Sequence, residues 1–242
     1  AASGQPQNAQ APFTGPPKFK PAAPPPNSDA AELPPPLPDG ARALLLAVFA
    51  EGEGVRIAGA VKNDEGREIP DGSGVTLSRE EWLKKLDAAD GNPNGIFRST
   101  DRTGIYITVN PMKAGGSRDA DVTAFRHALI EFDNISPVEQ FNLYLASRIP
   151  CAAIISSGGK SVHAWVKVDA QNRAEYDDRT RLLHGYFEAT GVQIDGKNKN
   201  PSRFSRLPNC VRFKARQELL ALNTGAESFT EWLKLVAEDE LG

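Results

Sequence analysis

The order of apolar strands and helices between residues 126 and 217 constrains the fold of this chain more than any other feature. The predicted elements are, in chain order, a strand over 128–132, a helix over 136–149, strands over 152–156 and 161–168, a helix over 173–190, and a last strand with its loops within 193–213. Ser136 and Pro137 are typical of a helix start, and Gly191 is typical of a helix end. Elements in this order predict an α+β fold.

The order β-α-β-β-α-β is the split βαβ arrangement of ferredoxin-like and RNA-recognition-motif folds. We therefore predict a catalytic core of this type over 123–217. An additional N-terminal α/β subdomain is predicted over 39–122, and a C-terminal helical segment over 218–242. The elements expected in these flanking parts are a helix over 41–49, a strand over 55–61, a helix that opens with the Ser78/Glu81 capping box, a strand over 104–110, and a helix over 229–238 capped by Ser228 and Glu231.

Residues 1–38 are rich in Pro, Ala, Gln and Asn, including the runs at 24–26 and 34–36. Such a composition buries too little apolar surface to fold, and we expect a disordered Pro-rich linker. Because the chain starts without Met, we also expect it to be a piece of a longer protein.

Targeting signals are not visible in the sequence. No apolar run reaches the roughly 18 residues that a membrane-spanning helix needs, and no signal peptide is recognisable, so no membrane partner is expected. Cys151 and Cys210 are far apart and form no CxxC pair. A cytoplasmic location is the expectation.

Positive charge is concentrated in one part of an acidic chain. The 242 residues carry a net charge of −3, which on its own argues mildly against nucleic-acid binding. The stretch 196–217, however, has no Asp or Glu and contains Lys197, Lys199, Arg203, Arg206, Arg212, Lys214 and Arg216. A local basic surface is what a phosphate-binding site requires, and a solvated basic loop is the alternative.

Two carboxylates follow the first predicted core strand as Glu131-Phe132-Asp133. Side chains two positions apart on a strand point to one face, so both acids converge while Phe132 faces the other side. Adjacent carboxylates repel unless they share a proton or a cation, and Mg²⁺ binds one or two carboxylates together with substrate phosphates. A strand end that turns out to solvent is the alternative interpretation.

A glycine turn and two polar residues follow the next strand in the segment Ser157-Gly158-Gly159-Lys160-Ser161-Val162-His163. A Walker A loop needs Gly five positions before its Gly-Lys pair, and Ile154 stands there, so a P-loop is excluded. Ser161 and His163 share one strand face and can both donate hydrogen bonds to phosphate oxygens, and Lys160 can reach a phosphate. For His163 alone, a structural role is the alternative.

Asp195 opens the basic stretch and can join the first two acids. Three carboxylates beside cationic residues suit two metal ions and a triphosphate. The alternative is an ordinary Asp-Gly turn.

Taken together in this order, the three segments resemble the archaeo-eukaryotic primase superfamily in its phage, plasmid and bacterial primase-polymerase form. The resemblance covers about residues 95 to 215, and its most specific part is the S-x-H pattern with its GGK lead. The matching segments are FRHALIEFD at 125–133, SGGKSVHAW at 157–165, the stretch from Asp195 to Pro208, and the upstream segments 107–111 and 118–123. Glu131 departs from the Asp that many members carry, and Asn209 stands where Gly is frequent.

The resemblance implies a template-dependent nucleotidyltransferase that makes or extends primers, as a DNA primase or primase-polymerase. It implies that Glu131, Asp133 and Asp195 are catalytic and bind two Mg²⁺ or Mn²⁺ ions. The implied nucleotide-binding residues are Lys160, Ser161, His163, Arg203 and Arg206, and the implied nucleic-acid-binding residues are Lys197, Lys199 and Arg212. Lys113 is a weaker candidate. His127 and His184 are expected to be structural.

The implied partners are nucleoside triphosphates and a single-stranded DNA template with its primer, in a bacterial, phage or plasmid replication context. A fused or associated helicase is a further partner that the resemblance allows for. The alternative function is a catalytically inactive replication-initiator or single-stranded nucleic-acid-binding module with the same fold. An RNA-recognition-type binding domain is less favoured, because the strand faces carry acids, Ser and His in place of the stacking aromatics.

Overall fold

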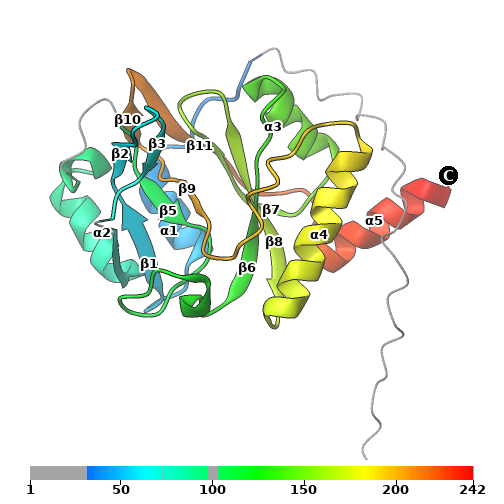
Figure 1. Ribbon diagram of the computed structural model, residues 1–242, viewed down its shortest axis with the longest axis horizontal. Coiled ribbons are helices and arrows are strands. Elements are labelled where there is room, and N and C mark those ends of the chain that lie inside the picture. Colours follow the sequence, from blue (N-terminus) through cyan, green and yellow to red (C-terminus); the bar gives the residue numbers. More distant parts are fainter. Residues whose placement is uncertain (1–31, 73, 98–102, 242) are drawn as a thin grey trace, which may run out of the picture.

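The computed structural model describes residues 32–72, 74–97 and 103–241. In the part nearest the C-terminus, a five-stranded antiparallel sheet has the order β10-β11-β7-β8-β6 and carries helices on one face (Figure 1). The elements of this part are β6 (Phe125–Ile130), α3 (Pro137–Ala146), β7 (Cys151–Ser156), β8 (Val162–Ala170), α4 (Arg173–Ala189), β10 (Cys210–Arg212), β11 (Ala215–Thr224) and α5 (Phe229–Leu241). The α+β class predicted from the sequence is confirmed.

A second antiparallel sheet has the order β4-β1-β5-β9. Its strands are β1 (Gly54–Ala58), β4 (Val75–Ser78), β5 (Tyr106–Thr108) and β9 (Phe204–Arg206), accompanied by α1 (Gly40–Val48), α2 (Arg79–Ala88), the 3₁₀ helices η1 (Pro93–Gly95) and η2 (Asp119–Asp121), and the hairpin of β2 (Ala60–Lys62) and β3 (Glu68–Pro70). Because β9 comes from the C-terminal half of the chain, this sheet joins both halves.

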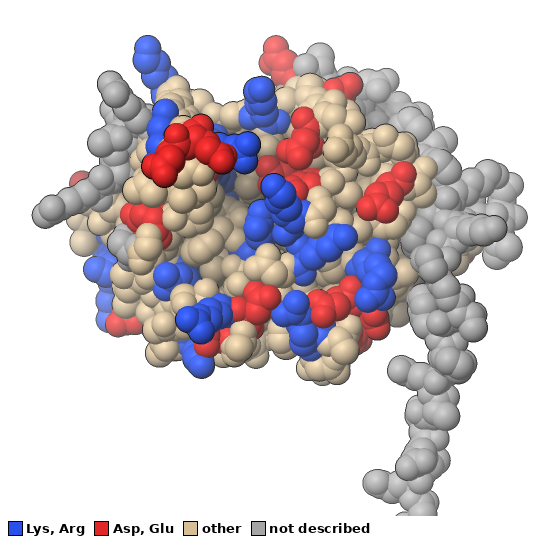
Figure 2. Space-filling view, viewed as in Figure 1, with Lys and Arg blue, Asp and Glu red and all other residues tan. Residues whose placement is uncertain are grey.

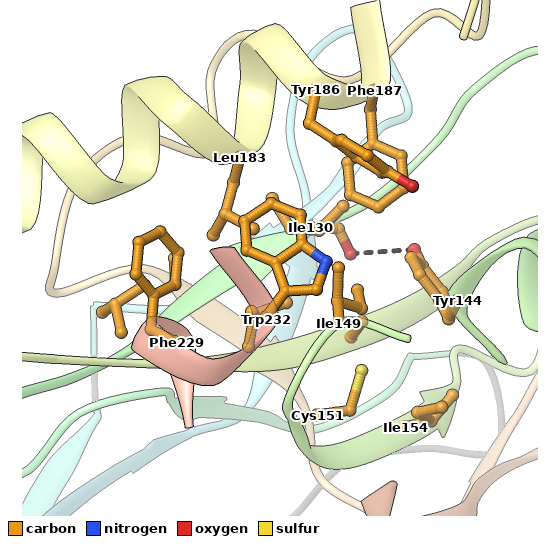
Figure 3. Packing of buried hydrophobic residues seen from close by; sticks show 14 of the residues in the cluster. Ile130, Tyr144, Ile149, Cys151, Ile154, Leu183, Tyr186, Phe187, Phe229 and Trp232 are labelled. Atoms are coloured by element: carbon orange, nitrogen blue, oxygen red, sulfur yellow. Dashed lines mark hydrogen bonds between the residues drawn. The ribbon is translucent and has the colours of Figure 1, made fainter. Parts of the chain in front are cut away.

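The alternation of side chains along β6 and β8 separates two apolar cores. Ile130 points into the core that α3, α4 and α5 cover, where Trp232 is also buried (Figure 3). Ala128 and Phe132 belong to the same core. Leu129 and Trp165 point to the opposite face and pack in a second core with residues of β1, β5 and α1. The five-stranded sheet is therefore buried on both faces, and polar side chains at its strand ends can lie between the two sheets.

Several strands differ in extent from the predictions. The first core strand runs from Phe125 to Ile130, earlier than the predicted 128–132, and the expected strand over 55–61 is divided at Gly59 between two sheets. The expected last strand within 193–213 is reduced to one bridge between Phe132 and Ile194, followed by the short strands β9 and β10. That bridge lies beside β6, the place where a split βαβ fold has its last strand.

Strand β11 is the longest described element that the sequence pattern did not predict, and residues 218–224 belong to it instead of to a helical segment. Its pairing with β7 shifts register between Leu219 and Ala221. A bulge interrupts the period of two by which a strand is recognised, so Leu219 and Leu220 are both buried. The predicted Ser78/Glu81 capping box is present. The Ser136 and Ser228 hydroxyls accept from the Glu139 and Glu231 amides, so these two predicted helix starts are also confirmed.

The end of the Pro-rich segment packs against the domain. Residues 32–38 form no helix or strand, but the Leu37 amide donates to the Leu219 carbonyl, and Leu33 packs on the helix-covered core. The disorder expected for these seven residues is therefore wrong, because Leu33 and Leu37 pack against the two apolar cores. Residues 1–31 lie outside the described residues.

Cys151 and Cys210 are buried free thiols. Within the described ranges, no helix has the length and apolar character needed to span a bilayer.

Candidate active site

The three predicted acids are brought together by the bridge that continues β6. Phe132 pairs with Ile194, and the Asp195 amide donates to the Glu131 carbonyl at 3.0 Å. Phe132 is fully buried against Tyr144 and Phe187, so Glu131 and Asp133 point to the opposite side. The segment between α4 and β9 runs from the helical layer toward the second sheet (Figure 1), and Asp195 lies on this segment.

Asp133 is an exposed carboxylate next to two other carboxylates. Burial of part of the group raises its pKa, and the charges of Asp195 and Glu131 raise the pKa further, while Lys197 opposes them. Asp195 also accepts a hydrogen bond from the Lys197 amide at 2.9 Å, so it caps the turn that the alternative interpretation expected. Asp195 therefore forms the turn and lies close enough to Asp133 to repel its charge.

Glu131 is held by a histidine and by hydrogen-bond donors. Its Oε1 lies 3.7 Å from His163 Nε2, and its Oε2 accepts from Asn198 Nδ2 at 3.3 Å. Burial alone would raise the pKa of Glu131, but His163 and the hydrogen bonds from Ser161 and Asn198 bring this pKa below its usual value. Glu131 is therefore an ionised carboxylate at neutral pH. The first acid therefore lies beside the S-x-H pair, which comes from a different part of the chain.

His163 of β8 connects the two sheets through its contact with β9. Its Nδ1 is 3.0 Å from the Ser205 hydroxyl on β9, and only 5% of the residue is exposed. Burial lowers the pKa of His163; Glu131 opposes this shift, and the nearby guanidinium groups of Arg206, Arg212 and Arg203 add to it. Cationic side chains from the last basic stretch therefore surround this imidazole, as expected for a site that receives an anion.

The loop that contains Gly158 and Lys160 is fixed by a residue that the sequence did not single out. Gln140 of α3 is completely buried; its amide donates to the Lys160 carbonyl at 2.9 Å, and its carbonyl accepts from the Val162 amide at 2.7 Å. Gly158 has a φ of +68°, and a Cβ atom there would lie 2.8 Å from the Arg216 carbonyl. The loop thus needs glycine, and the exposed Lys160 leads directly into Ser161.

Arg206 and Arg212 are tied to a second residue that the sequence did not single out, Glu68 of β3. Glu68 accepts from both guanidinium groups and from the Gly104 amide, and its side chain is only 4% exposed. Burial opposes the ionised form, but the two arginines and the Gly104 amide outweigh it and lower the pKa of Glu68. Arg206 also lies over the Tyr106 ring at 3.9 Å, and Arg212 donates to the Ser157 carbonyl at 3.2 Å.

The remaining predicted cations differ in exposure. Lys160, Lys197 and Lys199 are exposed, and Arg203 is half-buried. Lysine and arginine side chains gather beside acidic ones on the face shown in Figure 2. Lys113 is paired with Asp121 at 2.7 Å. The expected phosphate contacts of these residues stay predictions.

The donor chemistry of the acids fits a hard divalent cation. Asp133 and Asp195 offer carboxylate oxygens, the ligand type that Mg²⁺ and Mn²⁺ prefer, and a cation would relieve the repulsion that raises the pKa of Asp133. Among the described residues, no three His, Cys, Asp or Glu side chains lie close enough to enclose an ion. Glu131 is instead directed to His163 and Asn198.

Comparison with known proteins gives structural relatives only. No family model and no curated protein matches the sequence. The structure is similar to the AEP domain of the primase-polymerase of cyanophage S-2L, with a TM-score of 0.55 and 19% identity over 84% of this chain and 100% of that chain.

Two further similar structures are those of the primase RepB' and of its catalytic domain in complex with initiator DNA. Their TM-scores are 0.47 and 0.45, and each is 20% identical over 84% of this chain, covering 61% and 93% of the respective structures. The similarity to the cyanophage domain establishes that this chain has the fold of an archaeo-eukaryotic primase domain.

Proposed function

We propose that this chain is a template-dependent nucleotidyltransferase of the DNA primase or primase-polymerase type. The observation that carries the proposal is the meeting of Asp133 and Asp195 beside the Glu131–His163 pair within a primase fold. Carboxylates on one side and cationic or hydrogen-bond-donating groups on the other match the two halves of phosphoryl transfer, which needs charge neutralisation and positioning more than covalent chemistry.

Asp133 and Asp195, with Glu131 as the third carboxylate, would hold two Mg²⁺ or Mn²⁺ ions. When bound, such ions supply activation of a 3′-hydroxyl and neutralisation of the leaving pyrophosphate. Ser161, His163 and Lys160 would bind the triphosphate, because they follow one loop and strand face next to Glu131. Arg203 and Arg206 would add positive charge from strand β9 and the segment just before it. Arginine suits this role because its planar group can bind two phosphate oxygens at once.

The partners follow from the same arrangement. Nucleoside triphosphates fit the S-x-H side, and single-stranded DNA template with primer fits the basic stretch from Lys197 through Lys199 to Arg212. A fused or associated helicase in a bacterial, phage or plasmid replication system is part of the same proposal. Such a helicase would separate the DNA duplex and so provide the single-stranded template.

The test is an incorporation assay on single-stranded template, with and without a primer, using ribonucleotides or deoxyribonucleotides and Mg²⁺ or Mn²⁺. We expect incorporation by the wild type and none by Asp133→Asn. The matched control is Asp178→Asn, which removes an exposed acid paired with Arg181 on α4. Incorporation by Asp133→Asn at the wild-type rate would contradict the proposal.

A second function is favoured by one observation, the engagement of the Glu131 carboxylate with His163 and Asn198. A carboxylate held in this way could stabilise the fold of an inactive replication-initiator or single-stranded nucleic-acid-binding module. Such a module would bind single-stranded DNA but incorporate no nucleotide under any of the conditions above. The same assay, combined with a DNA-binding measurement, separates the two functions.

A further inference from the structure

An aromatic side chain is displayed at the tip of the β10–β11 hairpin. Arg212 pairs with Ala215, so Phe213 and Lys214 alone form the turn. Their φ angles of +48° and +72° place both in the left-handed region, where Asn-Gly is the usual pair because bulky residues are strained there. Phe213 is 44% exposed, so its ring gains little from burial. The sequence thus places a large apolar ring in a strained and exposed position.

Cations surround this ring. The ammonium of Lys62 lies 5.1 Å from the Phe213 ring centroid, and the guanidinium carbon of Arg212 lies 5.2 Å from it. Lys214 and Arg216 are exposed next to it in the acid-free stretch. The acids of the neighbouring β2–β3 hairpin are Asp64 and Glu65 in its turn and Glu68, of which Glu65 is paired with Arg67 and Glu68 with the two arginines.

A series of contacts connects the Phe213 hairpin to the candidate active site. Arg212, the residue before Phe213, donates to the Ser157 carbonyl at the start of the glycine loop. An added Cβ at Gly159 would lie 2.8 Å from the same guanidinium group. A strand of nucleic acid that reaches Lys160 and Ser161 can therefore extend to Phe213 within a few nucleotides.

We propose that Phe213 is a stacking platform for an unpaired base of single-stranded nucleic acid, with Lys62, Arg212 and Lys214 binding the phosphates on either side. Single-strand binding sites combine aromatic rings with a positively charged track in this way. The charge around the ring favours a polyanion over an apolar protein surface. The inference rests on the proposed function for its partner class, but it concerns binding, which can occur without synthesis.

The chain allows a direct spectroscopic test with Phe213→Trp. Its three natural tryptophans, Trp82, Trp165 and Trp232, are at most 2% exposed. The introduced indole is therefore the accessible one, and its fluorescence should be quenched by acrylamide. An oligothymidylate, added without nucleotide or metal, should quench the emission by stacking and protect it from acrylamide. Protection that fails to appear at oligonucleotide concentrations that saturate binding overturns the proposal.

Affinity measurements by fluorescence anisotropy of a labelled oligothymidylate provide the second readout. Phe213→Ala should weaken binding about five- to a hundredfold, since one base–aromatic stack is lost. Phe213→Leu should weaken binding nearly as much, while Phe213→Tyr should retain it. The matched control is Ile69→Ala, which removes a side chain that is 41% exposed. Ile69 pairs with Val61 while Lys62 pairs with Glu68, so Ile69 points to the hairpin face away from Phe213.

The outcomes separate this proposal from the proposed function. If the protein incorporates no nucleotide but the indole of the Phe213→Trp variant is still protected by oligothymidylate, the synthetic activity is wrong and the stacking site stands. If incorporation is normal and Phe213→Ala binds oligothymidylate within twofold of the wild type, the stacking site is wrong. A change of oligomeric state in Phe213→Ala, seen by sedimentation without nucleic acid, would assign the ring to a protein interface and overturn the proposal.

Discussion

Asp133 is the residue whose ionisation reports most directly on the site. Its raised pKa means that the folded protein binds this proton more tightly than the unfolded chain does, so its contribution to stability falls as the pH rises past the ordinary value for Asp. A divalent ion should offset this effect. We predict that Mg²⁺ or Mn²⁺ raises the melting temperature of the wild type at pH 7, and that Asp133→Asn abolishes this rise.

Catalysis should respond to the same substitution. Loss of a metal-binding carboxylate removes several kcal/mol of transition-state stabilisation, so incorporation should fall by at least about a hundredfold. Without divalent ions, Asp133→Asn should melt at or slightly above the wild-type temperature, because it removes a repelled charge. Asp178→Asn should keep both the activity and the metal-dependent stabilisation. An identical metal response in wild type and Asp133→Asn would contradict the assignment.

His184 and His127 are two buried histidines that differ in their hydrogen bonds, and both are expected to be structural. Burial lowers the pKa of each to about 4. His127 Nδ1 lies 3.0 Å from the Val109 carbonyl, whereas neither ring nitrogen of His184 has a partner among the described residues. Both histidines bind a proton less readily when folded, so they stabilise the fold above about pH 6.5 and lose this contribution as the pH falls toward 4.

We therefore predict that His184→Leu stabilises the protein relative to wild type, and that this gain is larger at pH 5 than at pH 7 by on the order of a few kcal/mol. An apolar side chain of similar size leaves no buried nitrogen unsatisfied. His127→Leu is the control, and it should destabilise at pH 7 because the Val109 carbonyl loses its partner. Urea unfolding at the two pH values measures both. Equal pH dependence in wild type and His184→Leu would refute the prediction.

The β2–β3 hairpin is the element that connects the N-terminal part to the arginines of the site. Glu68 is nearly buried between Arg206 and Arg212, and removing one partner of such a pair costs about 3–5 kcal/mol because the other charges stay buried. We predict that Glu68→Ala lowers the free energy of unfolding by about 3–5 kcal/mol, measured by urea unfolding at pH 7. The low pKa of Glu68 means that the wild-type contribution is present above about pH 4.5 and is lost as the pH falls further.

Function gives a second readout for this hairpin. Glu68→Asp keeps the charge but shortens the side chain, so it should fold well yet raise the KM for nucleotide more than it lowers kcat. Glu65→Gln, which breaks the exposed pair with Arg67, should change stability by less than about 1 kcal/mol. If Glu68→Asp leaves KM unchanged, Glu68 contributes to the fold alone.

The predictability of an element depended on whether its signal was local. Capping boxes such as Ser136 with Glu139 mark helix starts because four residues are enough to form them. Strand β11 was missed because its bulge at Leu219 and Ala221 breaks the alternation. The short strand β9 has no pattern of its own, since three residues acquire strand geometry only by pairing with β5. Tertiary pairing, which the sequence does not display, defines such elements.

At the scale of the whole molecule, the site residues predicted from sequence are those that share one strand face or one short loop. The period of two in a strand identified two pairs of residues that share a face, Glu131 with Asp133 and Ser161 with His163. Glu68 and Gln140 were not identified, because each reaches the site from a segment distant in sequence. Asn198 lies three residues after Asp195 but was not identified, because an amide there has no pattern that predicts its contact with Glu131. Buried polar residues of this kind carry no sequence signal until the sheets are paired.

The molecule as a whole is acidic, so nucleic-acid binding must depend on where its cations lie. Lys197 and Lys199 are exposed in the segment that carries Asp195, and each phosphate contact to single-stranded DNA contributes about 0.7 to the slope of log affinity against log salt. We predict that changing both lysines to Gln weakens oligothymidylate binding at low salt and makes the slope less steep by about 1.4.

The control for this effect removes the same net charge elsewhere. Lys84→Gln with Lys85→Gln changes two exposed lysines on α2, far along the chain from the basic stretch. If local contacts determine binding, this control keeps the wild-type slope, because its two lysines lie outside the basic stretch that is proposed to contact the phosphates. If the slope of log affinity against log salt becomes less steep by the same amount in both double variants, net charge alone governs binding, and the basic stretch has no special role. Anisotropy titrations between low and moderate salt distinguish the two outcomes.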